Sequence, residues 1–240
     1  LELRLIGPDA AIGTQQLERE QPNIRAVLEW STTGLSDRAR ADLGLRLGGS
    51  LWRFWCTRGY LREGHRWLTD LLPAARGDDP TTAKARYAAG CVAEDLGEFA
   101  AAQPLYEQAQ ALWEALGDRL QVVNSLIALG SICSSRGNYT DARERFERAL
   151  ALARELNDRR TIAVALSNLG GLSWSVGDYA AAEAYHKEGL AIRRELKNPQ
   201  AVSVSLTSLG LVAARRGDPD TAQKYYQESL ETMRALRNPA

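Results

Sequence analysis

A three-part pattern that recurs every 40 residues is the feature that most constrains how this 240-residue chain can fold. In the unit at 118–157 it consists of an Ala-Leu-Gly triplet ending at Gly130, a Gly-Asn-Tyr turn beginning at Gly137, and a Glu-Leu-Asn-Asp segment beginning at Glu155. The glycine of the triplet returns at the same step along the chain: Gly90, Gly130, Gly170 and Gly210. A period held by three independent marks is typical of a repeat solenoid, in which each unit packs only on its neighbours.

The repeat divides the chain into segments, each of which is expected to form two helices joined by a turn. We expect four regular helix pairs within residues 78–240, at about 81–117, 118–157, 158–197 and 198–237. A divergent pair is expected over 36–77, and residues 1–35 are expected to form an N-terminal helical segment that leads in from a missing upstream domain. No alternation typical of strands is sustained anywhere, so the predicted fold class is all-α.

Start signals refine the expected helix boundaries. Pro8-Asp9 is interpreted as the start of a helix at about 9–20, and Pro22 as an early residue of a second helix that runs through about Thr33. A long amphipathic helix is expected from Ser36 to about Thr57. Three residues are well placed to cap the first helices of their pairs: Asp118, Asp158 and Asn198.

The recurring glycine sits in a helix interior, where it costs about 1 kcal/mol relative to alanine. Keeping that cost at four equivalent places indicates a close approach of two helices. A small residue follows each glycine after twelve positions: Ala102, Ala142, Ala182 and Ala222. Four positions further on comes a bulky residue, which we expect to fill the wedge between neighbouring repeats: Tyr106, Phe146, His186 and Tyr226.

The composition gives no electrostatic reason to expect nucleic acid or an anionic membrane as a partner, because 30 basic and 30 acidic residues balance. No apolar run approaches the roughly 18 residues of a membrane span, and no signal peptide is visible. Cys56, Cys91 and Cys133 are far apart in helical stretches, so we expect buried free thiols in a reducing cytoplasm. The chain opens at Leu1 without methionine, and we interpret it as a fragment of a larger protein.

No catalytic or metal-binding constellation is visible in the sequence, so we expect no enzymatic activity, no cofactor and no metal. The phosphate-binding pattern G-x-x-x-x-G-K-[ST] is absent, which places any ATPase machinery outside this chain. The two histidines, His65 and His186, belong to no His/Cys cluster with metal-ligand spacing. Gly48-Gly49 and Gly170-Gly171 are interpreted as packing glycines within helices rather than as a phosphate cradle.

The order of these marks resembles the tetratricopeptide repeat (TPR) over residues 81–237. The usual repeat has about 34 residues, whereas this one has 40, as in the longer repeats of kinesin-light-chain-like and bacterial regulator arrays. The resemblance implies a right-handed α-solenoid of antiparallel helix pairs, a TPR superhelix, whose first helices line a concave groove. It also implies that a peptide, a protein or a small-molecule inducer binds in that groove.

The glycine register then selects groove-facing positions, six and two residues before each glycine and one, four and five residues after it. From these positions and from the divergent pair we take the candidate binding residues: Arg53, Lys84, Glu94, Asn124, Ser131, Asn168, Trp174 and Arg215. Asn168 matches the position where peptide-binding repeats of this family carry an asparagine that hydrogen-bonds to a backbone amide of the ligand. The alternative is a polar side chain that serves only its own helix. Trp174 stands where two other repeats have small residues, so it is either a ligand anchor or a plug beside Gly170 and Gly171.

Two N-terminal phrases resemble the start of the repeat region in bacterial STAND regulators (signal-transduction ATPases with numerous domains), which include activators with a maltose-regulator-like repeat domain. The phrases are EQPNIRAVLEW at 20–30, and LWRFW at 51–55 followed by RGYLREG at 58–64 and WL at 67–68. In the second phrase we expect Trp52 and Trp55 to lie in the core. Arg53 and Phe54 point elsewhere and are expected within reach of the groove.

This second resemblance implies a non-enzymatic sensor or partner-binding module, the C-terminal repeat region of such a regulator. Binding of an inducer, peptide or protein to the concave face would release the upstream ATPase domains of the same protein for oligomerisation. The alternative is a constitutive scaffold or adaptor that holds a protein segment without switching. Neither interpretation involves direct nucleic-acid binding by this chain or a place in a membrane.

Overall fold

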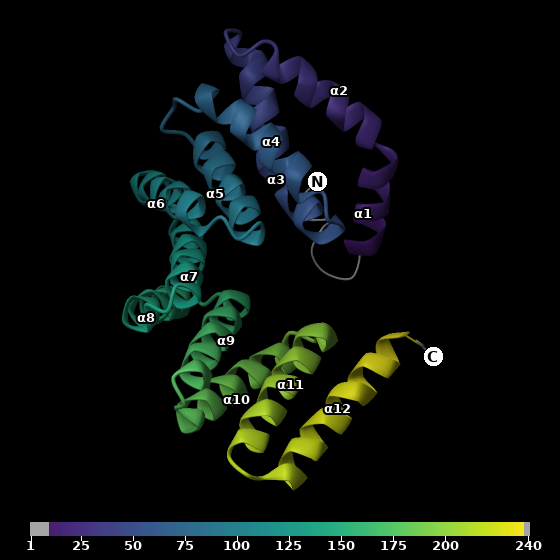
Figure 1. Cartoon of the computed structure of the whole chain (residues 1–240), viewed down its shortest axis with the longest axis vertical. Helices are drawn as coiled ribbons and strands as arrows, with labels where there is room; N and C mark the ends of the chain where they lie inside the picture. Colours follow the sequence, from purple (N-terminus) through teal and green to yellow (C-terminus); the bar gives the residue numbers. More distant parts are fainter. Residues whose placement is uncertain (1–9, 238–240) are drawn as a thin grey trace. The chain divides into compact units, whose positions relative to one another are not determined.

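The computed structural model describes residues 10–237, and all regular elements in that range are helices (Figure 1). In chain order they are α1 (Ala10–Arg19), α2 (Gln21–Thr32), α3 (Arg38–Arg58), α4 (Leu61–Leu71), the short 3₁₀ helix η2 (Leu72–Ala74), α5 (Pro80–Asp95), α6 (Phe99–Leu116), α7 (Arg119–Ser135), α8 (Tyr139–Glu155), α9 (Arg159–Ser175), α10 (Tyr179–Glu195), α11 (Pro199–Arg215) and α12 (Pro219–Arg237). From α3 onward, helices pack in successive pairs such as α3–α4, α5–α6, α9–α10 and α11–α12, which confirms the predicted all-α solenoid class. The predicted start signal Pro8-Asp9 and the segment 1–8 lie outside the described residues.

Contacts between Cα atoms divide the chain into two compact units, residues 1–121 and residues 122–240. Unit 1 contains α1 to α6 and the first residues of α7, and unit 2 contains the rest of α7 and α8 to α12. The division falls inside a helix rather than at a loop. The domain limits expected from the sequence, at 35 and 77, remain predictions.

Side-chain caps begin the helices where the sequence predicts them. Asp158 accepts hydrogen bonds from the backbone N–H groups of Arg160 and Thr161 at 3.0 and 3.1 Å. Asp118 and Asn198 accept equivalent bonds from the backbone N–H three residues further on, both at 3.1 Å. These bonds satisfy N–H groups that the start of a helix leaves unpaired, so the local signals set where each pair begins.

Residues in the left-handed conformation form the turns of the array. Gly137 and Gly177, with φ of 79° and 82°, turn the chain inside their pairs. Between pairs, the equivalent positions of successive repeats are Gly117 (φ 72°), Asn157 (φ 54°) and Lys197 (φ 51°). Asn157 and Lys197 are the two residues other than glycine with positive φ within 10–237. The third mark of the repeat, the segment that begins at Glu155 in the 118–157 unit, therefore contains a residue that must adopt a positive φ. Asparagine adopts this conformation more easily than lysine.

Each recurring glycine lies under the bulky residue that follows it by 16 positions. A Cβ atom on Gly130 would be 2.5 Å from the Phe146 ring, and one on Gly170 would be 2.5 Å from the His186 ring. The same contact recurs in the other two repeats: Gly90 with Tyr106, and Gly210 with Tyr226. Glycine at this position is what lets the two helices of a pair approach closely, as predicted.

In unit 2 the same rings are also covered from a second side. Phe146 and His186 are 2% and 6% exposed, whereas Tyr226 in the last described pair is 38% exposed. A further pair follows each of the first two rings, and its first helix packs against the helix that carries the ring. The bulky position therefore lies on its own pair and against the next one, which agrees with the predicted wedge.

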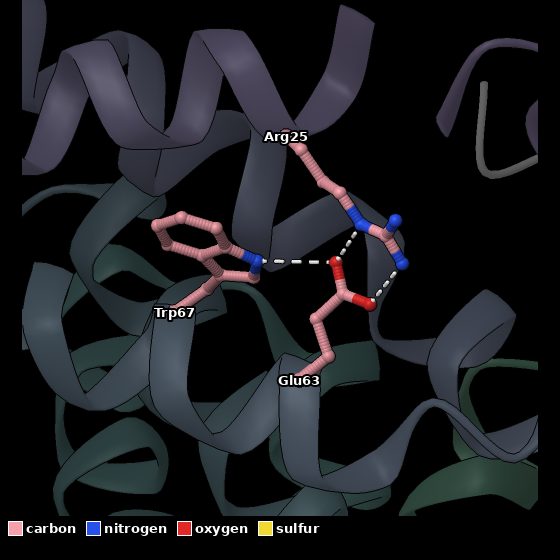
Figure 2. Close-up of polar contacts among 3 residues, drawn as sticks. All are labelled: Arg25, Glu63 and Trp67. Atoms are coloured by element: carbon pink, nitrogen blue, oxygen red, sulfur yellow. Dashed lines mark hydrogen bonds and ion pairs between the residues drawn. The ribbon is translucent and has the colours of Figure 1, made fainter. Parts of the chain in front are cut away.

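In unit 1, the two N-terminal phrases that resemble STAND regulators contact each other directly (Figure 2). Arg25 of α2 donates two hydrogen bonds to Glu63 of α4, from Nε to Oε1 and from Nη2 to Oε2, both at 2.7 Å. Trp67 Nε1 donates a third bond to Glu63 Oε1 at 3.4 Å. The Arg25 bonds hold the pKa of Glu63 below its ordinary value, so this carboxylate stays charged and ties α2 to α4.

The prediction that Phe54 reaches the groove is wrong. Phe54 is 1% exposed and stacks on Tyr60, with ring centroids 5.6 Å apart. Trp55 is buried as predicted, and its ring fills the space beside Gly64. Phe54 and Trp55 share the face of α3 that packs into the core, whereas Trp52 is only half-buried. Arg53, one position before Phe54, is half-buried and contacts Trp52 instead of the core.

Candidate functional site

Unit 2 exposes one stripe of residues on each of the first helices α9 and α11. The accessible residues follow one another at steps of four, four, three and four, which places them on one side of a helix. They are Arg160, Val164, Asn168, Gly171 and Ser175 on α9, and Gln200, Val204, Ser208, Leu211 and Arg215 on α11. We call this set the first-helix face. Every groove position that the register predicts on these two helices is exposed or half-buried.

Three aliphatic side chains of the first-helix face are open to solvent. Val164 is 40% exposed, Leu211 is 48% exposed and Val204 is 62% exposed. Leucines on the opposite sides of the same helices are buried, with Leu169 at 0% and Leu209 at 1%. The three exposed residues therefore contribute little to helix packing. Val204 and Leu211 lie two turns apart on one side of α11, and neighbouring apolar residues in solvent mark interaction surfaces.

Trp174 and Arg215 meet at one end of this face. The Arg215 guanidinium lies over the Trp174 ring, with Cζ 5.7 Å from the ring centroid. The indole does not plug the space beside the two glycines. The nearest atoms to a Cβ at Gly170 belong to His186, and nothing lies within 4 Å of a Cβ at Gly171. The anchor interpretation fits this geometry better, and it remains a prediction.

Two polar candidates of unit 2, Asn168 and Ser131, bond within their own helices. Asn168 Nδ2 donates to the Val164 carbonyl at 3.0 Å, and Ser131 Oγ donates to the Ile127 carbonyl at 3.1 Å. Asn124 is half-buried on α7. The intra-helix alternative for Asn168 is thus present in the structure, and a grip on a ligand backbone stays a prediction.

The three candidates of unit 1 are half-buried, and two of them make contacts between helices. The Arg53 guanidinium lies over the Trp52 ring, 4.2 Å from its centroid, and Lys84 Nζ donates to a serine hydroxyl of α3 at 3.3 Å. Glu94 accepts a hydrogen bond from the Tyr106 hydroxyl at 2.7 Å, and burial raises the pKa of this carboxyl. The contacts of Lys84 and Glu94 join α5 to α3 and to α6, so these two residues stabilise helix packing besides any ligand contact, whereas the Arg53 contact lies within α3.

Two of the cysteines, Cys56 and Cys91, lack the properties of catalytic thiols. All three are free, and burial raises the pKa of Cys91 to about 12 and raises that of Cys56 as well. A thiol reacts as its thiolate, so both are inert near neutral pH. Burial also lowers the pKa of His186 to about 4, which keeps this ring neutral. Within residues 10–237 no group of three His, Cys, Asp or Glu side chains could hold a metal ion, and no helix could span a membrane.

Sequence reasoning missed an open cavity in unit 1, with a volume of about 1070 Å³. It lies between the start of α3 and the start of α5, and its lining carries charges of both signs: Arg38, Asp42, Arg76 and Asp79. One of these, Asp79, already caps α5 by accepting a hydrogen bond from the Thr82 N–H at 2.9 Å. The only sequence signal there is the Gly-Asp-Asp-Pro stretch at 77–80, which predicts a turn rather than a site.

Comparison with protein families agrees with this architecture. The family model described as the MalT-like TPR region matches residues 57–238. No curated protein matches the chain.

Several solved structures share the fold. BtubC (BKLC) from P. vanneervenii has a TM-score of 0.75 and 22% identity, over 93% of this chain and 95% of that one. A Rap protein complexed with Competence and Sporulation Factor has a TM-score of 0.70 and 17% identity, over 95% and 72%. The Rap conjugation gene regulator of the plasmid pLS20, in complex with the Phr* peptide, has a TM-score of 0.68 and 16% identity, over 81% and 53%. At these identities the similarity shows the fold alone.

Proposed function

The chain belongs to the family of MalT-like TPR regions, and from that membership we propose that it is the non-catalytic sensor and interaction region of a STAND-type bacterial regulator. Its ligand is a peptide, a protein segment or a small-molecule inducer that binds the first-helix face. Upstream domains of the same protein receive the signal. The free thiols suit a reducing cytoplasm, where we place the module.

The exposed aliphatic residues of the first-helix face are the observation that carries this proposal. Val204 and Leu211 occupy positions that the helix packing of unit 2 does not need, and they remain 62% and 48% exposed. Large apolar side chains flanked by polar ones on an accessible face provide the anchors that a bound segment requires. Two proteins of similar fold are seen in complex with Competence and Sporulation Factor and with the Phr* peptide, which supports a peptide as ligand here.

A charge placed among these aliphatic residues tests the location of the binding face. Val204→Asp and Leu211→Asp should each weaken a peptide selected from a display library by about tenfold or more, because a carboxylate would be desolvated against an apolar side chain. Leu196→Asp is the matched control, since Leu196 is 44% exposed at the end of α10 and lies outside this face. Isothermal titration calorimetry measures the affinity, and circular dichroism verifies folding. Unchanged affinity in both face variants would place the ligand elsewhere.

A sensor and a constitutive scaffold differ in what the ligand does to the rest of the chain. A sensor ligand should change amide hydrogen exchange in helices that it does not touch, such as α8 and α12, because binding shifts the packing of the array. A scaffold's partner should protect only α9 and α11. Hydrogen exchange with and without the selected peptide separates the two, and protection confined to the contact surface would favour the scaffold.

A further inference from the structure

The first helices of unit 2 carry no carboxylates along their length, and Asp158, which caps α9, lies just before its first residue. Helices α7, α9 and α11 contain no Asp or Glu at all. The second helices α8, α10 and α12 each carry three or more. Acidic and basic residues balance over the whole chain, so this separation is a property of the two sides of the array rather than of its composition.

The carboxylates of the second helices pair with arginines of neighbouring repeats. Arg154 of α8 pairs with Glu188 of α10 at 2.8 Å, and Arg194 of α10 pairs with Glu228 of α12. The second pair repeats the first one 40 residues later. These bonds use the acidic groups on the second-helix side, where they link one repeat to the next.

Arg215 is different from these arginines. Its neighbour Arg216 pairs with Glu183 of α10, whereas no carboxylate of residues 10–237 forms an ion pair with Arg215. Arg215 is exposed, and its contact is the face of the Trp174 ring. A guanidinium that lies over an aromatic ring without a carboxylate partner has N–H groups left for a ligand, and these match the two oxygens of a carboxylate.

The distance along α11 sets the length of a segment that reaches both features. Val204 and Arg215 are eleven residues apart on the helix, which corresponds to a rise of about 16 Å. An extended peptide covers that distance with about five residues. A single short segment can therefore contact the exposed aliphatic residues and the guanidinium together.

From this arrangement we infer that the first-helix face selects a short aliphatic peptide segment that carries a carboxylate. The carboxylate pairs with Arg215, and the aliphatic side chains pack on Val164, Val204 and Leu211. This inference rests on the proposed function and specifies its ligand. Nucleic acid does not fit the face, because Arg160 and Arg215 are its only charged residues and aliphatic side chains separate them.

The inference is tested with three series of fluorescein-labelled hexapeptides of Leu, Val and Ala. The first series carries one glutamate and an amidated C-terminus, the second replaces glutamate by glutamine, and the third keeps glutamine but frees the terminal carboxylate. Fluorescence polarisation on the 240-residue chain should show the first series binding about tenfold tighter than the second. Binding of the third series shows whether a terminal carboxylate serves as well as a side chain.

Two variants assign the preference to Arg215. Arg215→Gln should remove the advantage of the carboxylate peptides, while Arg148→Gln, on the exposed side of α8, should leave it unchanged. Circular dichroism verifies that both variants fold. Equal binding of the glutamate and glutamine series, or a preference that survives in Arg215→Gln, would overturn the inference.

The failure of the inference and the failure of the proposed function give different results. If no hexapeptide binds but Val204→Asp still weakens a library-selected peptide, the face binds a ligand of another class and the inference is wrong. If no library peptide binds and Val204→Asp changes nothing, the proposed function fails as well.

Discussion

The imidazole of His186 lies directly on Gly170, where a Cβ atom would be 2.5 Å from the ring Cε1. Phe146 has the same relationship to Gly130, so histidine fills a place that the preceding repeat gives to phenylalanine. His186 is 6% exposed, and its Nδ1 has no hydrogen-bond partner among residues 10–237. The ring therefore acts as a packing element, which the comparison between repeats predicts.

Alanine at Gly170 and at Gly171 should have opposite effects, although the two positions adjoin. Gly170→Ala pushes on the buried His186 ring and should destabilise the chain by about 1–3 kcal/mol. Gly171→Ala meets nothing within 4 Å and should stabilise the helix by about 0.5–1 kcal/mol, since alanine is the better helix former. Urea denaturation of the two variants measures both free energies. Shifts of the same sign would contradict the close contact.

Acid should destabilise the chain through His186. Burial lowers its pKa from 6.5 to about 4, so below pH 6.5 the unfolded chain binds a proton that the folded chain does not. Its contribution to stability is therefore complete above about pH 6.5 and falls by about 2–3 kcal/mol as the pH drops toward 4. His186→Phe should remove this part of the acid sensitivity, and His65→Gln should keep it. Denaturation of each variant across that pH range provides the measurement.

Leu190 and Leu230 occupy equivalent positions 40 residues apart, yet they are 5% and 50% exposed. Leu190 packs with Val202 and Leu206 of α11, whereas no further helix pair covers α12 within the described residues. Leu190→Ala should therefore cost about 2–4 kcal/mol, and Leu230→Ala less than about 1 kcal/mol. Both variants lose the same atoms, so the difference between their free energies of unfolding measures the effect of burial by a neighbouring helix. Similar losses would show that another surface protects α12 in solution.

Removing the charge of Glu63 should loosen α2 without unfolding unit 1. Glu63→Gln should cost about 0.5–1 kcal/mol, because the pair with Arg25 is partly exposed to solvent. The pKa of Glu63 is lowered, so its contribution is present above its ordinary value of about 4.3 and disappears as the pH falls through the folded value. Faster amide exchange in α2 is the expected signal. The control variant Glu29→Gln, which lies on α2 itself, should leave the amide exchange of α2 unchanged.

The candidate site could be located from the sequence in part, because register is a property of the repeat. Counting from Gly170 and Gly210 correctly finds an accessible stripe on α9 and α11. The same count places Val204 and Leu211 in that stripe, but it does not give how far they are exposed, since an aliphatic residue in an amphipathic helix is normally buried. Their exposure depends on which side of the helix the neighbours leave open.

Local sequence signals specify the helix pairs, their order and their turns, because caps, left-handed turn residues and helix-interior glycines act on the local backbone and recur every 40 residues. Which side chains meet across helices depends on the packing of the helices in three dimensions. That packing places Arg25 on Glu63 and Arg215 over Trp174, and it buries Phe54. Each of these outcomes depends on the angle and distance at which two helices pack, and local propensities do not encode either quantity.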